Sequence, residues 1–271
     1  MVRLPSIHVH PRRAGPQLAR PRRALRTMSD GIQTIELEYE AGGTRCCGYL
    51  ALPEGDAGPV PGVLILHEWW GHDDYVRSRA EQVAELGYAG FAADLYGEGR
   101  QADHPDRAGA LMNELMGDPA LMAERFQAAM DALTGRPEVD GGRVAAAGYC
   151  MGGGIALQMA RAGVELAAVV SFHGSLETDN PASAGGVHPS LLVCTGADDP
   201  FVPAAHVRGL RAEMDAAGAA CEIVEYPGVV HAFTNPGATA RGERFGLPLR
   251  YDEGADQDSW TRMAELLRAS F

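Results

Sequence analysis

The stretch "AAAGYCMGGGIAL", residues 145–157, joins a run of small apolar residues to a predicted helix through a glycine-rich segment. Residues 148–152 have the form G-x-C-x-G, with Cys150 where the backbone has to turn sharply. A cysteine in a protein is usually buried and inert. Flanking glycines, however, allow a backbone turn that is too tight for residues with a Cβ. Such a turn exposes the cysteine sulfur at a helix N-terminus, where backbone N–H groups favour a thiolate. The stretch therefore indicates either a nucleophile or a buried cysteine in a tight turn.

The segments around this stretch alternate between expected strands and helices. Apolar runs at 63–71, 88–97 and 143–149 are typical of strands covered on both faces. Two earlier segments, 32–39 and 45–53, predict an antiparallel hairpin. We therefore expect one α/β domain over 28–271, with a mostly parallel sheet and helices on both faces. The other expected strands are 166–174, 190–199 and 221–226, and the expected helices are 74–86, 105–116, 119–134, 154–163, 203–217 and 255–270.

Composition excludes several classes of protein. The formal net charge is −13, although residues 1–27 hold seven arginines and no acid, so the remaining chain is more acidic still. Such a body is a poor partner for nucleic acid or anionic membranes. No apolar run is long enough to span a bilayer, which predicts a soluble protein. The Arg- and Pro-rich residues 1–27 predict a disordered extension, with a transit peptide as the alternative.

The five cysteines predict a reducing compartment. Their number is odd, and they form neither a C-x-x-C pair nor the spacing of a zinc site. Reduced thiols in a cytoplasm fit this pattern best. We expect no metal and no cofactor, since no H-E-x-x-H, P-loop or G-x-G-x-x-G motif is complete.

Reactive side chains recur where the predicted strands end. In parallel sheets, ligands bind at the carboxyl ends of the strands. These positions hold His67, Glu68, Asp94, Tyr96, Cys150, His173, Asp198, Asp199 and His231. G-x-S-x-G is the nucleophile elbow of the α/β-hydrolases, which supply nucleophile, acid and histidine in that order. Here Cys150, then Asp198 or Asp199, then His231 follow the same order.

Five ordered blocks, "HEWWG", "DLYG", "GYCMGG", "GADDPFVP" and "HAF", make residues 33–271 resemble the dienelactone hydrolase family. The resemblance implies a single-domain α/β-hydrolase fold and a Cys-His-Asp triad that cleaves lactones or esters without metal or cofactor. It implies Cys150 as the nucleophile and His231 as the base. For the acid, the spacing from the "FVP" block favours Asp199 over Asp198.

The resemblance also implies roles for residues near the first block. Glu68 matches a glutamate that can hold the thiol unreactive until substrate displaces it, although a structural salt bridge is the alternative. The backbone N–H groups of Trp69 and Met151, which follow Glu68 and Cys150, are expected to form the oxyanion hole. Trp70, Tyr96 and His173 either line the substrate pocket or pack in the core.

Two positions depart from the family pattern. Family members that act on dienelactone hold its carboxylate with two arginines, whose positions here are Glu98 and Asn235. Arg100 is two residues beyond the first position and can substitute for it, whereas "HAFTNP" offers no second cation. The sequence therefore favours a small neutral ester or lactone at least as strongly as dienelactone, with no expectation about oligomeric state.

Two other interpretations of Cys150 remain. Amidotransferase-like and chaperone-deglycase proteins also place a thiol on a strand–helix turn, but their partner residues are arranged differently. A redox sensor on the same fold is the non-enzymatic interpretation, because a fold alone does not determine function.

Overall fold

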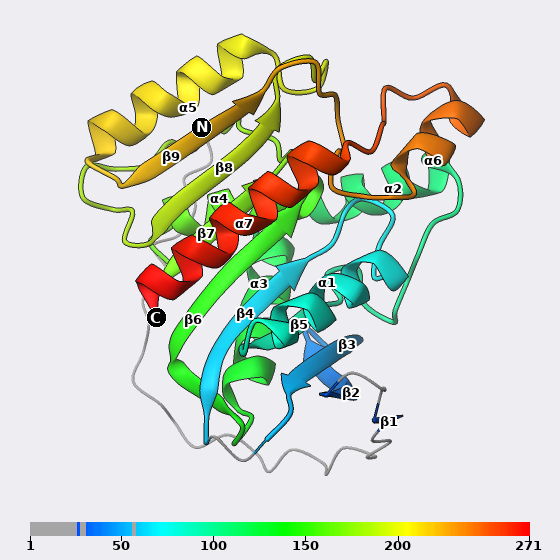
Figure 1. Ribbon diagram of the computed structural model, residues 1–271, viewed down its shortest axis with the longest axis vertical. Coiled ribbons are helices and arrows are strands. Elements are labelled where there is room, and N and C mark those ends of the chain that lie inside the picture. The colour runs from blue at the N-terminus through cyan, green and yellow to red at the C-terminus, as the bar shows by residue number, and fades with distance from the viewer. Residues whose placement is uncertain (1–25, 28–30, 56–57) are drawn as a thin grey trace.

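The computed structural model describes residues 26–27, 31–55 and 58–271 (Figure 1). The extension expected over residues 1–27 lies outside this part of the chain, apart from the short strand β1, Arg26–Thr27, which pairs with β2. In the described segments, no helix combines the length and the apolar character that a membrane crossing requires.

Within the described residues one sheet forms in the order β1-β2-β3-β5-β4-β6-β7-β8-β9. The first strands are antiparallel, and every pair from β5 onward is parallel, which confirms the predicted hairpin and mostly parallel sheet. The strands after β1 are β2 Ile32–Ala41, β3 Thr44–Pro53, β4 Val60–Leu66, β5 Ala89–Ala93, β6 Val139–Tyr149, β7 Ala168–Phe172, β8 Ser190–Gly196 and β9 Cys221–Tyr226.

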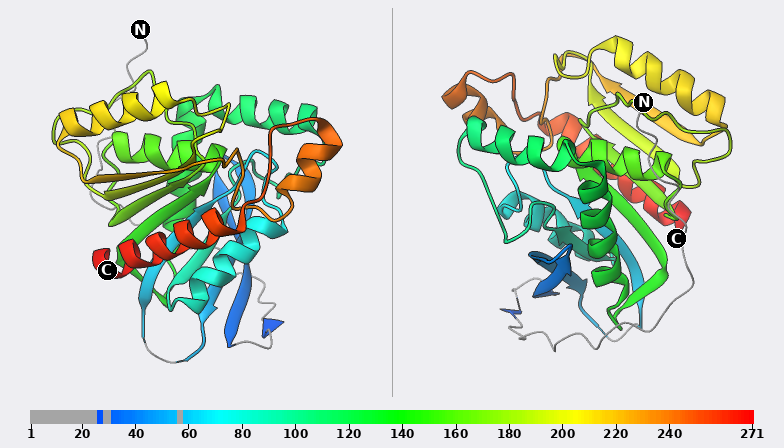
Figure 2. Two further views of the ribbon diagram at one scale, coloured as in Figure 1. Left: turned by 45° about the horizontal axis from the view of Figure 1, so that its top comes forward. Right: turned by 180° about the vertical axis from the view of Figure 1, so that it is seen from behind.

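Helices cover both faces of the sheet (Figures 1 and 2). On one face, α1 and α7 pack over a core that includes Val63 and Ile65 of β4. On the other, α3, α4 and α5 pack over a core that includes Leu64 and Leu66, because successive side chains of a strand point to opposite faces. The helices are α1 Asp74–Glu85, α2 Pro105–Met116, α3 Pro119–Thr134, α4 Met151–Arg161, α5 Ala204–Ala217, α6 Ala238–Phe245 and α7 Glu253–Ser270.

Helices α1, α5 and α7 differ from their predicted bounds by one or two residues, whereas α4 and α6 differ more from the sequence prediction. Helix α4 begins at Met151 rather than at residue 154, so it includes the glycines that propensity disfavours in a helix. Close packing explains their presence, since a Cβ on Gly153 would lie 2.7 Å from the Ser171 hydroxyl. Helix α6 was not predicted, because it is short, polar and interrupted by Gly242.

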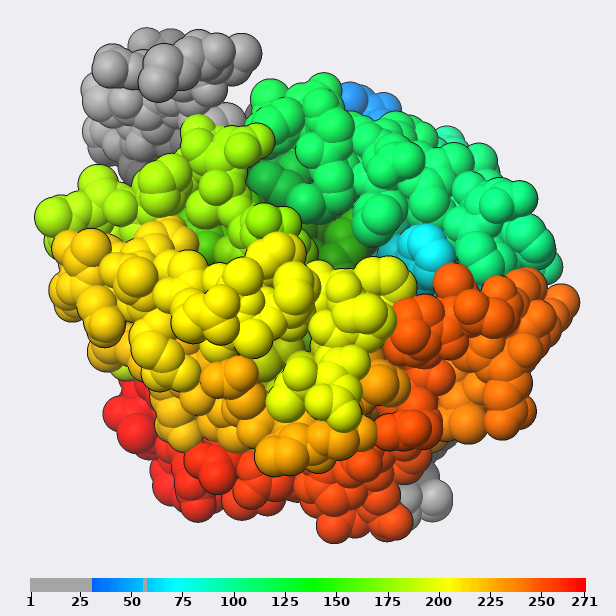
Figure 3. Space-filling model, turned by 90° about the horizontal axis from the view of Figure 1, so that it is seen from above, coloured from blue at the N-terminus to red at the C-terminus, as the bar shows by residue number. Residues whose placement is uncertain are grey.

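The carboxyl ends of the parallel strands gather the polar residues at one edge of the sheet. Strands β4, β6 and β7 end at Leu66, Tyr149 and Phe172, so the residues that follow them start the loops of this edge. Figure 3 shows that the chain after β4, in cyan, reaches the surface between the α2 region in green and the α6 region in orange.

Candidate active site

The turn between β6 and α4 holds Cys150 in a backbone conformation that L-residues rarely adopt, with φ 53° and ψ −115°. The flanking glycines make this turn possible. A Cβ on Gly148 would lie 2.1 Å from the carbonyl oxygen of Gly152, and a Cβ on Gly152 would lie 2.3 Å from that of Leu66. Both contacts are with backbone atoms, so neither position accepts a larger residue without moving the sheet or the helix.

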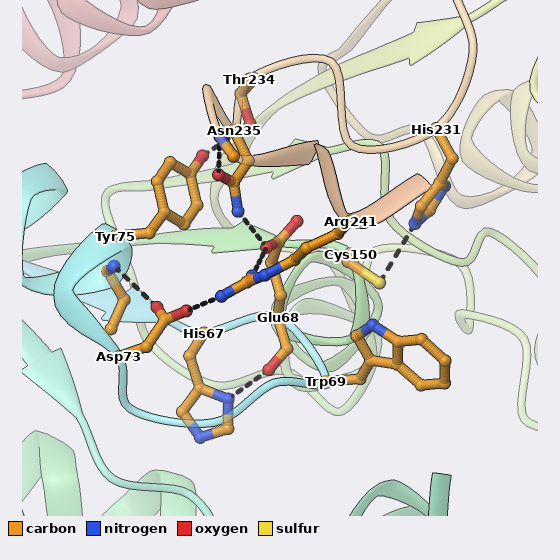
Figure 4. Close-up of polar contacts among 12 residues, drawn as sticks. His67, Glu68, Trp69, Asp73, Tyr75, Cys150, His231, Thr234, Asn235 and Arg241 are labelled. Atoms are coloured by element: carbon orange, nitrogen blue, oxygen red, sulfur yellow. Dashed lines mark hydrogen bonds and ion pairs between the residues drawn. The ribbon is translucent and has the colours of Figure 1, made fainter. Parts of the chain in front are cut away.

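Three side chains from distant parts of the chain meet at this turn (Figure 4). The Nε2 atom of His231 lies 3.2 Å from the Cys150 sulfur, and its Nδ1 atom lies 2.7 Å from Oδ2 of Asp199. Asp199 is buried, whereas the neighbouring Asp198 is exposed and is not the partner of the imidazole. The order sulfur, imidazole, carboxylate is the arrangement that activates a nucleophile.

Electrostatics at this site favour a charged imidazole. Burial opposes the imidazolium form, but the Cys150 sulfur as a thiolate and the Asp199 carboxylate outweigh that cost and raise the pKa of His231 to about 10. The charged imidazole therefore lies between the Cys150 sulfur and the Asp199 carboxylate. This pairing stabilises a nucleophilic sulfur while keeping the proton on the group that has to deliver it.

The residues of the two expected oxyanion donors, Trp69 and Met151, belong to the loop after β4 and to the start of α4. Met151 is the first residue of α4, and the leading N–H groups of a helix have no acceptor within it. The loop that carries Trp69 is held by Tyr96, whose hydroxyl donates to the Trp69 carbonyl at 2.9 Å. The Gly152 N–H donates to the His67 carbonyl at 3.1 Å, which fixes the turn to the end of β4. Tyr96 is thus a buried support for this loop.

Glu68 is buried behind the site and directed toward Asn235 and Arg241 (Figure 4). The Asn235 amide donates to Oε2 of Glu68 at 2.6 Å, and Nη1 of Arg241 lies 4.0 Å from the same oxygen. Burial raises the pKa of Glu68 to about 7, against the opposing effect of the Asn235 hydrogen bond. The carboxyl group is consequently held by Asn235, which occupies one of the two positions where the family places an arginine.

Arg241 is a cation of this region that the sequence analysis missed. It extends from α6, pairs with Asp73 at 3.0 Å and stacks over the Trp70 ring at 4.7 Å. It also lines a cavity of about 360 Å³ between α6 and the loop after β5, together with Arg244 and Phe245. Arg241 lies in the short polar helix α6, after the last recognisable motif of the sequence. No motif spacing or periodicity therefore predicted a role for it.

The remaining predicted residues lie around the site rather than in it. The Arg100 guanidinium binds Glu114 at 3.1 and 3.2 Å and the Tyr96 carbonyl, so its charge is already paired. Trp70 is buried against Phe245, while Trp69 is partly exposed. His173 is fully buried behind the turn and contacts the Cys150 backbone. No cluster of three His, Cys, Asp or Glu side chains suited to a metal ion occurs in residues 31–55 and 58–271.

Replacing Glu68 by glutamine tests the buried carboxyl group. Because the folded-state pKa of Glu68 is raised from 4.5 to about 7, the folded protein binds more protons than the unfolded chain between these values. Stability is therefore lost as pH rises through this window. Glu68→Gln removes that loss, so its free energy of unfolding relative to wild type should increase by about 3 kcal/mol from about pH 4 to about pH 8. Urea unfolding at both pH values measures the difference, and a pH-independent difference would contradict the assignment.

Comparisons with known proteins show the family of this chain. The family model described as "Dienelactone hydrolase family" matches residues 46–271. An Aquifex aeolicus protein named "Putative carboxymethylenebutenolidase" is 30% identical over 204 residues, which cover 73% of this chain and 86% of that protein. "Protein usf" of Aquifex pyrophilus is 29% identical over 229 residues, 83% of this chain and 93% of that protein.

A solved structure gives the same result. The crystal structure of a dienelactone hydrolase-like promiscuous phosphotriesterase from metagenomic libraries superposes with a TM-score of 0.82 at 37% identity and covers 89% of this chain and 99% of that one. The sheet order, the cysteine turn and these similarities lead to one assignment. The chain belongs to the dienelactone hydrolase family of the α/β-hydrolase class and is a hydrolase that acts on ester bonds.

Proposed function

We propose that the protein hydrolyses a small carboxylic ester or lactone through a thioester on Cys150. The observation that carries this proposal is the continuous contact from the Cys150 sulfur through His231 to Asp199, at 3.2 and 2.7 Å. In the first half of the reaction the thiolate attacks the ester carbonyl carbon. The resulting oxyanion accepts hydrogen bonds from the N–H groups of Trp69 and Met151, and donors of this kind contribute about 3 kcal/mol each.

The histidine transfers the protons in both halves. As the tetrahedral intermediate collapses, the carbon–oxygen bond breaks, and His231 gives its proton to the departing alkoxide. The neutral imidazole then takes a proton from water, which attacks the thioester carbonyl. The carboxylic acid leaves as the thiolate and the imidazolium are restored. Asp199 holds the Nδ1–H of His231 throughout and so keeps Nε2 directed at the sulfur.

The two departures from the family pattern bear on the charge of the small-molecule substrate. Asn235 and Glu98 stand where arginines would bind a carboxylate, and Arg100 is paired with Glu114. Arg241 is the cation nearest to Glu68 in the described residues, and it is shared with Asp73. We therefore propose a neutral ester or lactone as the preferred substrate.

All five cysteines are free, which supports a reducing compartment such as the cytoplasm.

A panel of esters and lactones of differing charge tests this function. We expect turnover of p-nitrophenyl acetate and of a neutral lactone, with lower kcat/KM for analogues that carry a carboxylate beside the reacting group. The same panel with peroxide-treated protein separates hydrolysis from redox sensing. Absence of turnover on every substrate, together with a stable sulfenate on Cys150, would show that the protein is a redox sensor rather than a hydrolase.

A further inference from the structure

A chain of buried polar contacts runs behind the reacting groups. The Cys150 N–H lies 3.0 Å from the Phe172 carbonyl oxygen and 3.1 Å from Nδ1 of His173, so it is shared between the two. Nε2 of His173 lies 2.7 Å from the Thr234 hydroxyl oxygen, which lies 2.7 Å from the Tyr75 hydroxyl. The chain thus links the cysteine turn directly to the residue three positions after His231.

The donors in this chain fix the protonation of His173. A backbone N–H can only donate, so Nδ1 of His173 accepts and carries no proton. The proton of a neutral imidazole is then on Nε2, from which it is donated to Thr234. Burial, together with the nearby charges of His231 and Arg79, lowers the pKa of His173 well below its usual value. His173 therefore remains neutral while His231, at 5.2 Å between ring centroids, carries the charge.

Thr234 is held from further sides as well. Arg79, itself buried and paired with Asp256 at 2.6 Å, donates to the Thr234 carbonyl. The loop between His231 and Thr234 contains Ala232 at φ 59°, and His173 has φ 40°. Non-glycine residues at positive φ are strained and persist only where their surroundings hold them. The loop that carries His231 and the loop that begins at His173 are thus two strained segments, and the contact between His173 and Thr234 joins them.

We propose that His173 and Thr234 are positioning residues that set the distance between the Cys150 sulfur and the His231 imidazole. This inference rests on the proposed function, since it concerns how the sulfur and the imidazole that react are held at contact distance. Neither side chain reaches substrate, because both are buried behind the turn. A small displacement of reacting groups is enough to slow a reaction about 100-fold, so loss of this link acts on the chemical step.

Thr234→Val tests the link because it removes the hydroxyl while keeping the shape of the side chain. We expect kcat for p-nitrophenyl acetate to fall about 10- to 100-fold with KM nearly unchanged. We also expect slower alkylation of Cys150 by iodoacetamide, since the His231 imidazole would no longer be held 3.2 Å from the sulfur that it activates. The matched control is Tyr75→Phe, which removes a buried hydroxyl from the far side of Thr234 and leaves the contact with His173. Tyr75→Phe should retain most of its activity.

A double-mutant cycle separates positioning from a general loss of stability. His173→Asn breaks the same link from the other side, so the double variant with Thr234→Val should be no slower than the slower single variant. Additive losses, or equal losses in Thr234→Val and Tyr75→Phe, would overturn the inference. Cys150→Ala distinguishes a failure of the positioning role from a failure of the proposed function. If it is inactive while Thr234→Val is unchanged, only the positioning role fails, whereas an active Cys150→Ala removes the proposed function itself.

Discussion

Cys150→Ala is expected to lower kcat/KM for ester hydrolysis by about four orders of magnitude or more. Removing the nucleophile of a triad costs nearly as much as removing the whole triad, because the remaining groups then have nothing to activate. His231 would keep its contact with Asp199 but lose the sulfur that lies 3.2 Å from Nε2. Alanine occupies less space than cysteine on the same backbone, so the variant should remain folded. Steady-state hydrolysis of p-nitrophenyl acetate measures the effect.

The matched control is a cysteine away from the turn. Cys221 is partly exposed on β9, and burial raises its pKa to about 11, which makes it a poor nucleophile at neutral pH. Cys221→Ala should therefore hydrolyse esters at the wild-type rate. If Cys150→Ala and Cys221→Ala were equally active, the nucleophile would have to be sought elsewhere in the chain.

Gly152→Ala is expected to lower the stability of the protein strongly. The added Cβ would lie 2.3 Å from the Leu66 carbonyl oxygen and 2.8 Å from that of His67, both backbone atoms of the loop edge of β4. Relief of these contacts requires α4 to move away from the central strand. We expect a loss of about 3 kcal/mol or more in the free energy of unfolding, together with loss of activity, because α4 carries the Met151 N–H.

Gly109→Ala is the control for this substitution. Gly109 lies inside α2, where a Cβ would meet no atom within 4 Å, and its backbone is helical. Alanine is favoured over glycine in a helix by about 1 kcal/mol, so this variant should be slightly more stable than wild type. Urea unfolding followed by circular dichroism compares the two. A Gly152→Ala protein as stable as wild type would show that the turn is looser than its contacts imply.

The fold was predictable because its strands and helices have clear periodicities. Apolar runs such as "VLIL" in β4 predicted central strands, and the predicted bounds of α2 and α3 agree with the structure. Helix α6 was missed because its sequence, "ATARGERF", is short, mostly polar and contains a glycine, and its position depends on tertiary contacts. One such contact is the close approach of Gly242 to the Leu249 carbonyl, where a Cβ would lie 2.3 Å from the oxygen.

That Cys150, Asp199 and His231 approach one another was predictable, but the contacts that surround them were not. The chain order and strand-end positions brought Cys150, Asp199 and His231 to one edge of the sheet. By contrast, nothing in the sequence indicates that Thr234 faces His173 or that Arg241 approaches Glu68. These contacts join loops and helices whose mutual position depends on the packing of the whole domain, and no local pattern encodes that packing.

The most direct test of the mechanism is to capture the acyl group on the enzyme. Wild-type protein is mixed with excess p-nitrophenyl acetate, quenched in acid within the first turnovers, digested and analysed by peptide mass spectrometry. We expect acetyl on the peptide that contains Cys150, and none after the same treatment of Cys150→Ala. Continued turnover with the acetyl group on another residue, or with no acylated peptide under any quench time, would contradict a thioester at Cys150.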